Sequence, residues 1–197
     1  RQRQMCIRDS TYTYNAVLQG SARHGDLATA RWILADLVHA AIARGVAHGP
    51  NEETMANVLW TYAVYRPPVR RADVARASAA PDSQVDDGAV ETEARTFTQA
   101  TPSTSPDVVA EVQALMARIL ADQGQADAGA HPLASVVPTP RMLNAYLSVL
   151  THHLRPAQRL EALVHATEAP DGVFQQAAVA PNAHTWAMVL EACAQHR

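Results

Sequence analysis

A thirteen-residue segment occurs twice in this chain and constrains its fold more than any other feature. Residues 13–25 read TYNAVLQGSARHG, and residues 185–197 read TWAMVLEACAQHR. Two weaker copies lie between them, TMANVLWTYAVYR from residue 54 and MLNAYLSVLTHHL from residue 142. The four starts are separated by 41, 88 and 43 residues. Periods of this size are typical of helical-repeat arrays, so the long middle interval predicts one repeat that carries a large insertion.

The first ten residues, RQRQMCIRDS, resemble a translated sequencing adapter, in which the transposase end gives MCIRD and the upstream adapter gives RQRQ. We therefore treat residues 1–10 as a non-native segment and leave them out of the fold; the alternative is a natural basic arm. We also expect the chain to be a piece of a longer protein. Without the three arginines and one aspartate of this segment, the formal net charge changes from −3 to −5. Cys193 is then the one remaining cysteine, which leaves neither a disulfide framework nor a thiolate metal site.

Apolar periodicity and turn residues divide the rest of the chain into helical hairpins. A helix over 13–23, a break at Gly25, an N-cap at Asp26 and a second helix to about Arg44 form the first unit. Gly20 and Ala30 are expected where these two helices approach closely. The domain prediction is repeat hairpin 1 and the first helix of repeat 2 over 11–66, a disordered insertion over 67–105, and the second helix of repeat 2, repeat 3 and the first helix of repeat 4 over 106–197.

The insertion is predicted from composition, because residues 67–105 contain few large apolar groups and cannot bury enough surface to offset the entropy of ordering. Ser105 is the expected cap of the helix that follows, and a second flexible stretch is expected over 124–137. Later helices are expected over 140–154, 156–168 and from 183 onward. The expected inward positions of these helices, and of the first unit, are Tyr14, Val17, Leu18, Met55, Val58, Leu59, Tyr62, Val108, Val112, Leu115, Met116, Ile119, Leu120, Leu160, Leu163 and Val164.

The run YNAVLQGSARHGDLATARWILADL over residues 14–37 resembles the pentatricopeptide repeat, and Gly49-Pro50-Asn51 and Ala180-Pro181-Asn182 resemble the closing residues of that repeat. The resemblance is strong in the first unit and loose in the third. It implies an all-α fold, an α-α superhelix of hairpins similar to tetratricopeptide arrays. It also implies binding of single-stranded RNA, one base per repeat.

In that family the discriminating positions lie near the start of the first helix and at the last residue of the repeat. The matching pairs here are Asn15 with Asn51 and Asn144 with Asn182, a combination that resembles the pyrimidine-preferring ones. Tyr12 and Arg141 are the expected stacking residues. Arginines that could contact phosphates are Arg23, Arg31, Arg44, Arg141, Arg155 and Arg159. In the second unit, Ala56 and Glu53 argue against base recognition.

The function expected from the resemblance is RNA processing, stability or translation in the mitochondrial matrix, as in fungal members, with single-stranded RNA and further proteins as partners. We expect no enzyme activity, cofactor, metal, membrane span or small-molecule substrate. The histidines lack metal-ligand spacing, Cys193 is expected to be a packed thiol, and no phosphate loop or nucleophile elbow is present. The alternative is a helical scaffold for protein partners, which would show an apolar or acidic groove where RNA binding needs a positive one.

Overall fold

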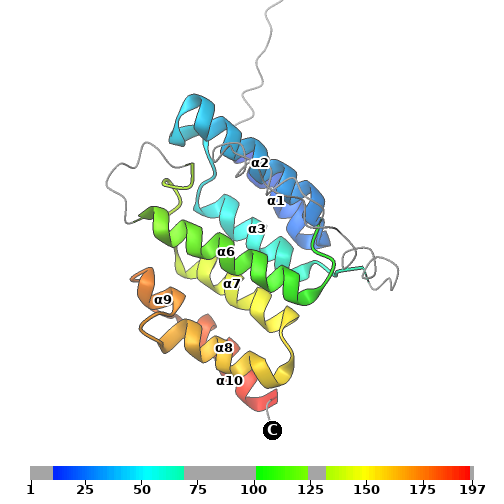
Figure 1. Ribbon diagram of the computed structural model, residues 1–197, viewed down its shortest axis with the longest axis vertical. Coiled ribbons are helices and arrows are strands. Elements are labelled where there is room, and N and C mark those ends of the chain that lie inside the picture. The colour runs from blue at the N-terminus through cyan, green and yellow to red at the C-terminus, as the bar shows by residue number, and fades with distance from the viewer. Residues whose placement is uncertain (1–10, 69–100, 124–131, 196–197) are drawn as a thin grey trace, which may run out of the picture.

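The computed structural model describes residues 11–68, 101–123 and 132–195, and every regular element in these ranges is a helix (Figure 1). In chain order the helices are α1 (Thr11–His24), α2 (Leu27–Arg44), the 3-10 helix η1 (Val46–His48), α3 (Glu52–Val64), α6 (Ser105–Gln123), α7 (Pro140–His153), α8 (Pro156–Glu168), α9 (Val173–Gln176) and α10 (Ala183–Gln195). The all-α prediction is therefore confirmed for the described part of the chain.

The four copies of the repeated segment lie in α1, α3, α7 and α10, each of which begins two residues before its copy. We call these the leading helices. Each packs on the next, α1 on α3, α3 on α7 and α7 on α10. The helices between them, α2, α6 and α8, each contact the leading helix before and the leading helix after. The array therefore runs from α1 and α2 at one end of the molecule to α10 at the other (Figure 1).

Turn and cap residues set the helix boundaries of the first unit. Asp26 caps α2, because its Oδ1 accepts from the backbone N–H of Thr29 at 3.2 Å. Gly25 has a φ of +67°, and a Cβ there would lie 3.1 Å from the carbonyl oxygen of Val64 on α3. Gly45, with a φ of +94°, follows the last residue of α2. The predicted end of α2 is confirmed.

One hydrophobic core connects all leading helices and the three long helices between them. Predicted inward positions that are buried in it are Leu18, Met55, Val58, Leu59, Tyr62, Val108, Val112, Leu115, Met116, Ile119 and Leu163. Tyr14, Leu120 and Leu160 are half-buried, and Val164 is 37% exposed. Most of the core was therefore predictable from helical periodicity.

Three predicted packing positions differ in the structure. A Cβ at Gly20 would meet nothing within 4 Å, so this glycine does not allow a close helix contact. Val17 is 48% exposed, and Cys193 is exposed rather than packed. The reason is positional: in the described structure α1 packs on α2 and α3, and α10 packs on α7 and α8. Each of these outer helices leaves uncovered a face that α3 and α7 bury.

Most of the predicted disordered insertion, residues 69–100, lies outside the described residues. At its C-terminal end, the carbonyl oxygen of Pro102 accepts a hydrogen bond from Tyr65 Oη at 2.9 Å. The cap of α6 is Thr104 rather than Ser105, since Thr104 Oγ1 accepts from the backbone N–H of Asp107 at 3.3 Å. Ser105 is instead the first helical residue.

Two connections hold more structure than the sequence predicted. Of the expected flexible stretch 124–137, residues 124–131 lie outside the described residues, but Leu133 and Val136 are buried in the core. The short helix α9 was not predicted, and its Phe174 is fully buried. Single apolar anchors of this kind lack the periodicity by which a helix is recognised in a sequence.

Candidate functional site

The N-termini of the leading helices lie side by side. Hydrogen bonds join the start of α1 to the start of α3, through Asn15 and Asn51, and the start of α3 to the start of α7, through Glu52 and Thr139. The start of α7 is joined in the same way to the start of α10. The leading helices are therefore parallel, and their first turns form one border of the molecule, which we call the N-terminal edge.

At the junction of α1 and α3, an asparagine of one helix bonds to the cap of the next. Asn15 Nδ2 donates to Asn51 Oδ1 at 3.2 Å and to Glu53 Oε2 at 3.3 Å. Asn15 Oδ1 accepts from Thr54 Oγ1 at 2.7 Å. Asn51 Oδ1 also caps α3 by accepting from the backbone N–H of Thr54 at 2.9 Å, while Thr54 Oγ1 accepts from the Asn51 N–H. This reciprocal cap resembles a capping box.

The junction of α7 and α10 repeats this network. Asn144 Nδ2 donates to Asn182 Oδ1 at 3.2 Å, and Thr185 Oγ1 donates to Asn144 Oδ1 at 2.7 Å. Asn182 Oδ1 accepts from the backbone N–H of Thr185 at 3.0 Å. Both asparagine pairs predicted from the resemblance are thus brought together, with the same two side-chain distances in each.

The members of each pair differ in exposure. Asn15 and Asn144 are each 4% exposed, and their amides bond to the following cap. Asn51 and Asn182 are exposed. The cap asparagine is therefore accessible from the protein surface, whereas the helix asparagine lies beneath it. This distinction was missing from the sequence prediction, which treated the two positions alike.

The junction of α3 and α7 has a different arrangement. Ala56 takes the place of the helix asparagine and is fully buried. Thr139 caps α7 by accepting from the backbone N–H of Met142 at 3.3 Å, and its hydroxyl donates to Glu52 Oε1 at 2.7 Å. Successive leading helices can therefore pack without the asparagine network. This junction has no pair of amides, and the prediction that the second unit does not contact a base stays a prediction.

Thr54 and Thr185 are site residues that were not predicted from the sequence. Both are fully buried, and each completes its network. The signal was present as Asn-x-x-Thr at residues 51–54 and 182–185. An Asn at the cap and a hydroxyl three residues later is a recognisable start of a helix.

The two predicted stacking residues lie in first turns of leading helices. Tyr12, in α1, is 82% exposed, and Arg141, in α7, is exposed. Since α3 packs on both α1 and α7, these two side chains belong to units that are not neighbours. Glu52 and Glu53 lie between them in the first turn of α3.

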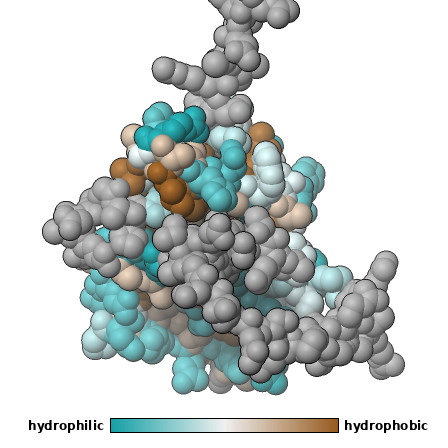
Figure 2. Space-filling view, turned by 45° about the horizontal axis from the view of Figure 1, so that its top comes forward, coloured by the Kyte–Doolittle hydropathy of each residue, from teal (hydrophilic) through white to brown (hydrophobic). Residues whose placement is uncertain are grey.

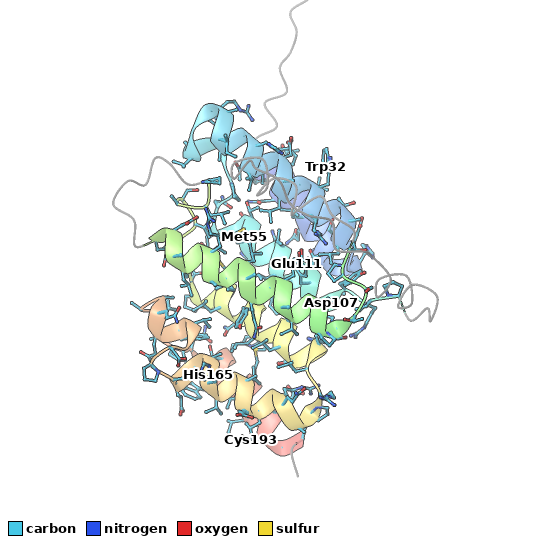
Figure 3. All side chains as sticks on the ribbon, in the orientation of Figure 1. Trp32, Met55, Asp107, Glu111, His165 and Cys193 are labelled. Carbon is cyan, nitrogen blue, oxygen red and sulfur yellow. The ribbon has the colours of Figure 1, made fainter. Side chains whose placement is uncertain are left out.

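The predicted phosphate-binding arginines do not share one groove. Arg31 is 5% exposed and forms an ion pair with Glu111 of α6 at 3.1 Å, on the side of α6 that faces α2 (Figure 3). Arg159 Nη1 donates to Gln195 Oε1 at 2.6 Å. Arg23 lies in the last turn of α1 and Arg155 precedes α8, so these two lie at the opposite border from the N-terminal edge. Of the six, Arg44 and Arg141 remain at the N-terminal edge. Arg44 is the last residue of α2, which ends close to the start of α3, and Arg141 is in the first turn of α7.

The Arg31 side chain is buried between helices and takes part in a polar contact there. Glu111 Oε1 also accepts from Tyr62 Oη at 2.7 Å, so one partly buried polar contact joins α2, α3 and α6. Burial, and secondly the Glu111 charge, raise the pKa of the Tyr62 hydroxyl well above its ordinary value of 10.0. Tyr62 therefore stays a neutral hydrogen-bond donor.

A cavity of about 480 Å³ is lined by residues of α6, α7 and α8 and of the turn before α9. Its lining includes the apolar side chains of Tyr146, Leu150 and Leu154. His165 and Asp171 are also in the lining; both are exposed, and His165 Nε2 lies 3.2 Å from Asp171 Oδ1. This cavity can hold an apolar group of side-chain size.

Comparison with profiles of protein families, with curated proteins and with solved structures finds no match for this chain. In the described ranges, no group of three histidine, cysteine or acidic residues is placed to hold a metal ion. Among the same residues, no helix combines the length and apolar character needed to cross a membrane.

Proposed function

We propose that this chain is a pentatricopeptide-type helical array that binds single-stranded RNA along its N-terminal edge, without catalysis of its own. The recurrence of the asparagine network is the observation that supports this proposal most. Because the α3–α7 junction packs with Ala56 in place of an asparagine, the network is not required for packing. Its recurrence at two other junctions favours a role for the cap amides that it orients.

The orientation of the cap amide follows from its hydrogen bonds. In each network, the cap Oδ1 accepts from the amide of the helix asparagine and from the threonine N–H. The oxygen is therefore held toward the protein, and Nδ2 is the part of the exposed amide that a ligand can reach. A pyrimidine offers acceptors to such a donor on its Watson–Crick edge. Asn51 and Asn182 would contact bases. Asn15 and Asn144 would orient the side chains of these two cap asparagines.

Other groups at the N-terminal edge supply the remaining parts of such a site. The exposed ring of Tyr12 offers a face on which a base can stack, and the Arg141 guanidinium can stack or pair with a phosphate. The partial positive charge of helix N-termini favours phosphate. Glu52 and Glu53, which follow Asn51 in the first turn of α3, oppose this attraction, so the expected affinity is lower at the first asparagine pair than at the second. The family resemblance extends the proposal to mitochondrial RNA processing, stability or translation and to a superhelical array.

The test replaces the cap amide without losing the cap. Asn182→Ser keeps an oxygen that caps α10 but removes the Nδ2 donor. We expect it to weaken binding of a pyrimidine-rich single-stranded RNA by about 2- to 10-fold, the size of one hydrogen bond. Thr139→Ser, at the junction without an amide, is the matched control and should leave affinity unchanged. Equal affinity of Asn182→Ser and wild type in a fluorescence titration at fixed salt would remove the support for base contact.

A scaffold that binds protein partners is the second candidate, and the cavity beside α8, whose lining is partly apolar, is the observation that favours it. The face of the molecule that Figure 2 shows also carries apolar residues among hydrophilic ones. Gln158→Trp, at an exposed position in the lining, would reduce the space in this cavity. A scaffold predicts that this change weakens binding of a protein partner and that the wild type shows no saturable RNA binding, whereas the RNA proposal predicts saturable RNA binding whose affinity and base preference this change leaves unaltered.

A further inference from the structure

The leading helix α3 has one side that faces away from α2 and α6. Tyr62 marks the opposite side, because its hydroxyl bonds to Glu111 of α6. At about 100° per residue, Glu53 and Trp60 lie roughly 180° and 200° around the helix from Tyr62. The residues on this side are Glu53, Asn57, Trp60 and Val64, and we call them the open face of α3. Since α1 and α7 pack on α3, the open face lies between two packed neighbours rather than at an end of the array.

The open face contains a buried amide without a hydrogen-bond partner. Asn57 is 3% exposed. The hydrogen bond that this residue accepts, from Thr61 Oγ1 at 2.8 Å, goes to its backbone carbonyl oxygen. Among the described residues, none forms a hydrogen bond with the Asn57 side chain. The amides of Asn15 and Asn144, by contrast, are bonded to the following cap. A buried amide needs a partner, so a group that reaches the open face from solution is the one left for Asn57.

Trp60 lies beside this amide, three residues further along the same face. Its side chain is half-buried and packs partly against the core. At the same depth, α1 carries Ala16 and Gln19, and α7 carries Ala145 and Ser148. None of these described neighbours is charged, and the two on α7 are at most 5% exposed. Such surroundings suit an uncharged planar ring better than a phosphate or a basic side chain.

We propose that Trp60 stacks on one base of a bound RNA and that the Asn57 amide forms a hydrogen bond with the same base. This inference rests on the proposed RNA binding and deepens it, because it gives a base contact to the unit that lacks the asparagine pair. Trp60 lies four residues, about 6 Å, further along α3 than Ala56. A strand at the N-terminal edge reaches it by turning one base inward.

This contact differs from the asparagine pairs in its selectivity. Every base has a face that stacks on an aromatic ring. An amide offers both a donor and an acceptor, so Asn57 can meet the edge of any base. The second unit should therefore add affinity without adding base preference.

Tryptophan emission reports on this contact directly. The chain has three tryptophans, and the double variant Trp32→Phe/Trp186→Phe leaves Trp60 as the one that remains. We expect oligouridine to quench its emission. The quenching should saturate over the same RNA concentrations as the anisotropy of a labelled strand, since both would follow one binding event.

Substitutions test the contribution of each side chain to affinity. Trp60→Leu keeps an apolar group against the core and removes the aromatic face, so it should weaken binding of oligouridine and oligoadenosine by the same factor, about 5- to 100-fold. Trp60→Phe should recover part of this loss. Asn57→Ala should weaken both strands by about 2- to 10-fold. Trp32→Leu, at a position of α2 that is 62% exposed, is the control and should leave affinity unchanged (Figure 3).

The outcomes separate this inference from the proposal on which it rests. If the wild type binds RNA saturably while the emission of Trp60 does not change, the stacking contact is wrong and the asparagine proposal stands. A loss of affinity in Trp60→Leu for one strand alone would contradict contact without base preference. Unchanged affinity of Asn57→Ala would remove the amide from the contact. Absence of saturable RNA binding by the wild type would overturn both proposals. The emission measurement keeps Trp60 in place, so it decides the question even if Trp60→Leu has a lower urea midpoint.

Discussion

The asparagine network at the α7–α10 junction predicts a measurable coupling between Asn144 and Thr185. Asn144→Ala removes the acceptor of the Thr185 hydroxyl and the donor to Asn182 Oδ1. The hydroxyl, which is fully buried, can still reach Asn182 Oδ1 at 3.1 Å. Because one partner remains, we expect the loss in free energy of unfolding to be about 1–2 kcal/mol, in the lower part of the range for an unsatisfied buried group.

Thr185→Val keeps the shape of the side chain and removes the hydroxyl. It leaves Asn144 Oδ1 without its donor, so its expected cost is also about 1–2 kcal/mol. Once either partner is gone, removing the other costs less. The double variant should therefore be more stable than the sum of the single effects predicts, by about 1 kcal/mol.

Urea unfolding followed by circular dichroism measures all four proteins of this cycle. The matched cycle is Asn15→Ala with Thr54→Val, whose hydroxyl–amide distance is the same 2.7 Å. The Asn15 cycle should show a larger single-variant effect, because Asn15 also donates to Glu53. Strict additivity in both cycles would refute the network as a stabilising contact between leading helices.

Three further changes test other parts of the fold by urea unfolding. Gly25→Ala should destabilise by about 1–3 kcal/mol, because φ is +67° and the added Cβ lies 3.1 Å from the Val64 carbonyl oxygen. Arg31→Ala should cost about 1–3 kcal/mol, because the Glu111 carboxylate loses its ion-pair partner but keeps the Tyr62 hydroxyl and some contact with solvent, whereas Arg31→Met with Glu111→Gln should cost less. Burial lowers the pKa of His153 below its ordinary 6.5, so the neutral ring is favoured and stability should fall as the pH drops below 6.5. His153→Gln should remove that part of the pH dependence.

Local signals explain what the sequence could predict. Helix positions such as Met55 and Leu59 follow from 3.6-residue periodicity, and the end of α2 follows from Gly45. The asparagine pairs followed from the repeat resemblance, because Asn51 and Asn182 close successive units. These features depend on residues close together in the chain or on the repeat register.

Long-range partners explain what the sequence could not predict. The buried Asn15 accepts a hydrogen bond from Thr54, 39 residues away, and the buried Asn144 accepts one from Thr185, 41 residues away. Arg31 was expected at the surface, but its carboxylate partner comes from α6, beyond the long insertion. No local pattern marks such an arginine as part of the core.

The central claim is that the cap amides contact RNA bases, and base preference tests it most directly. Two proteins would be compared, the wild type and the double variant Asn51→Ser/Asn182→Ser. Each would be titrated with labelled oligouridine, oligocytidine and oligoadenosine of equal length at one salt concentration. We predict saturable binding of the wild type with a preference for the pyrimidine strands. The double variant should lose that preference while its caps, and therefore its urea midpoint, are largely retained. A wild-type chain without saturable binding to any strand at physiological salt would contradict the RNA-binding proposal.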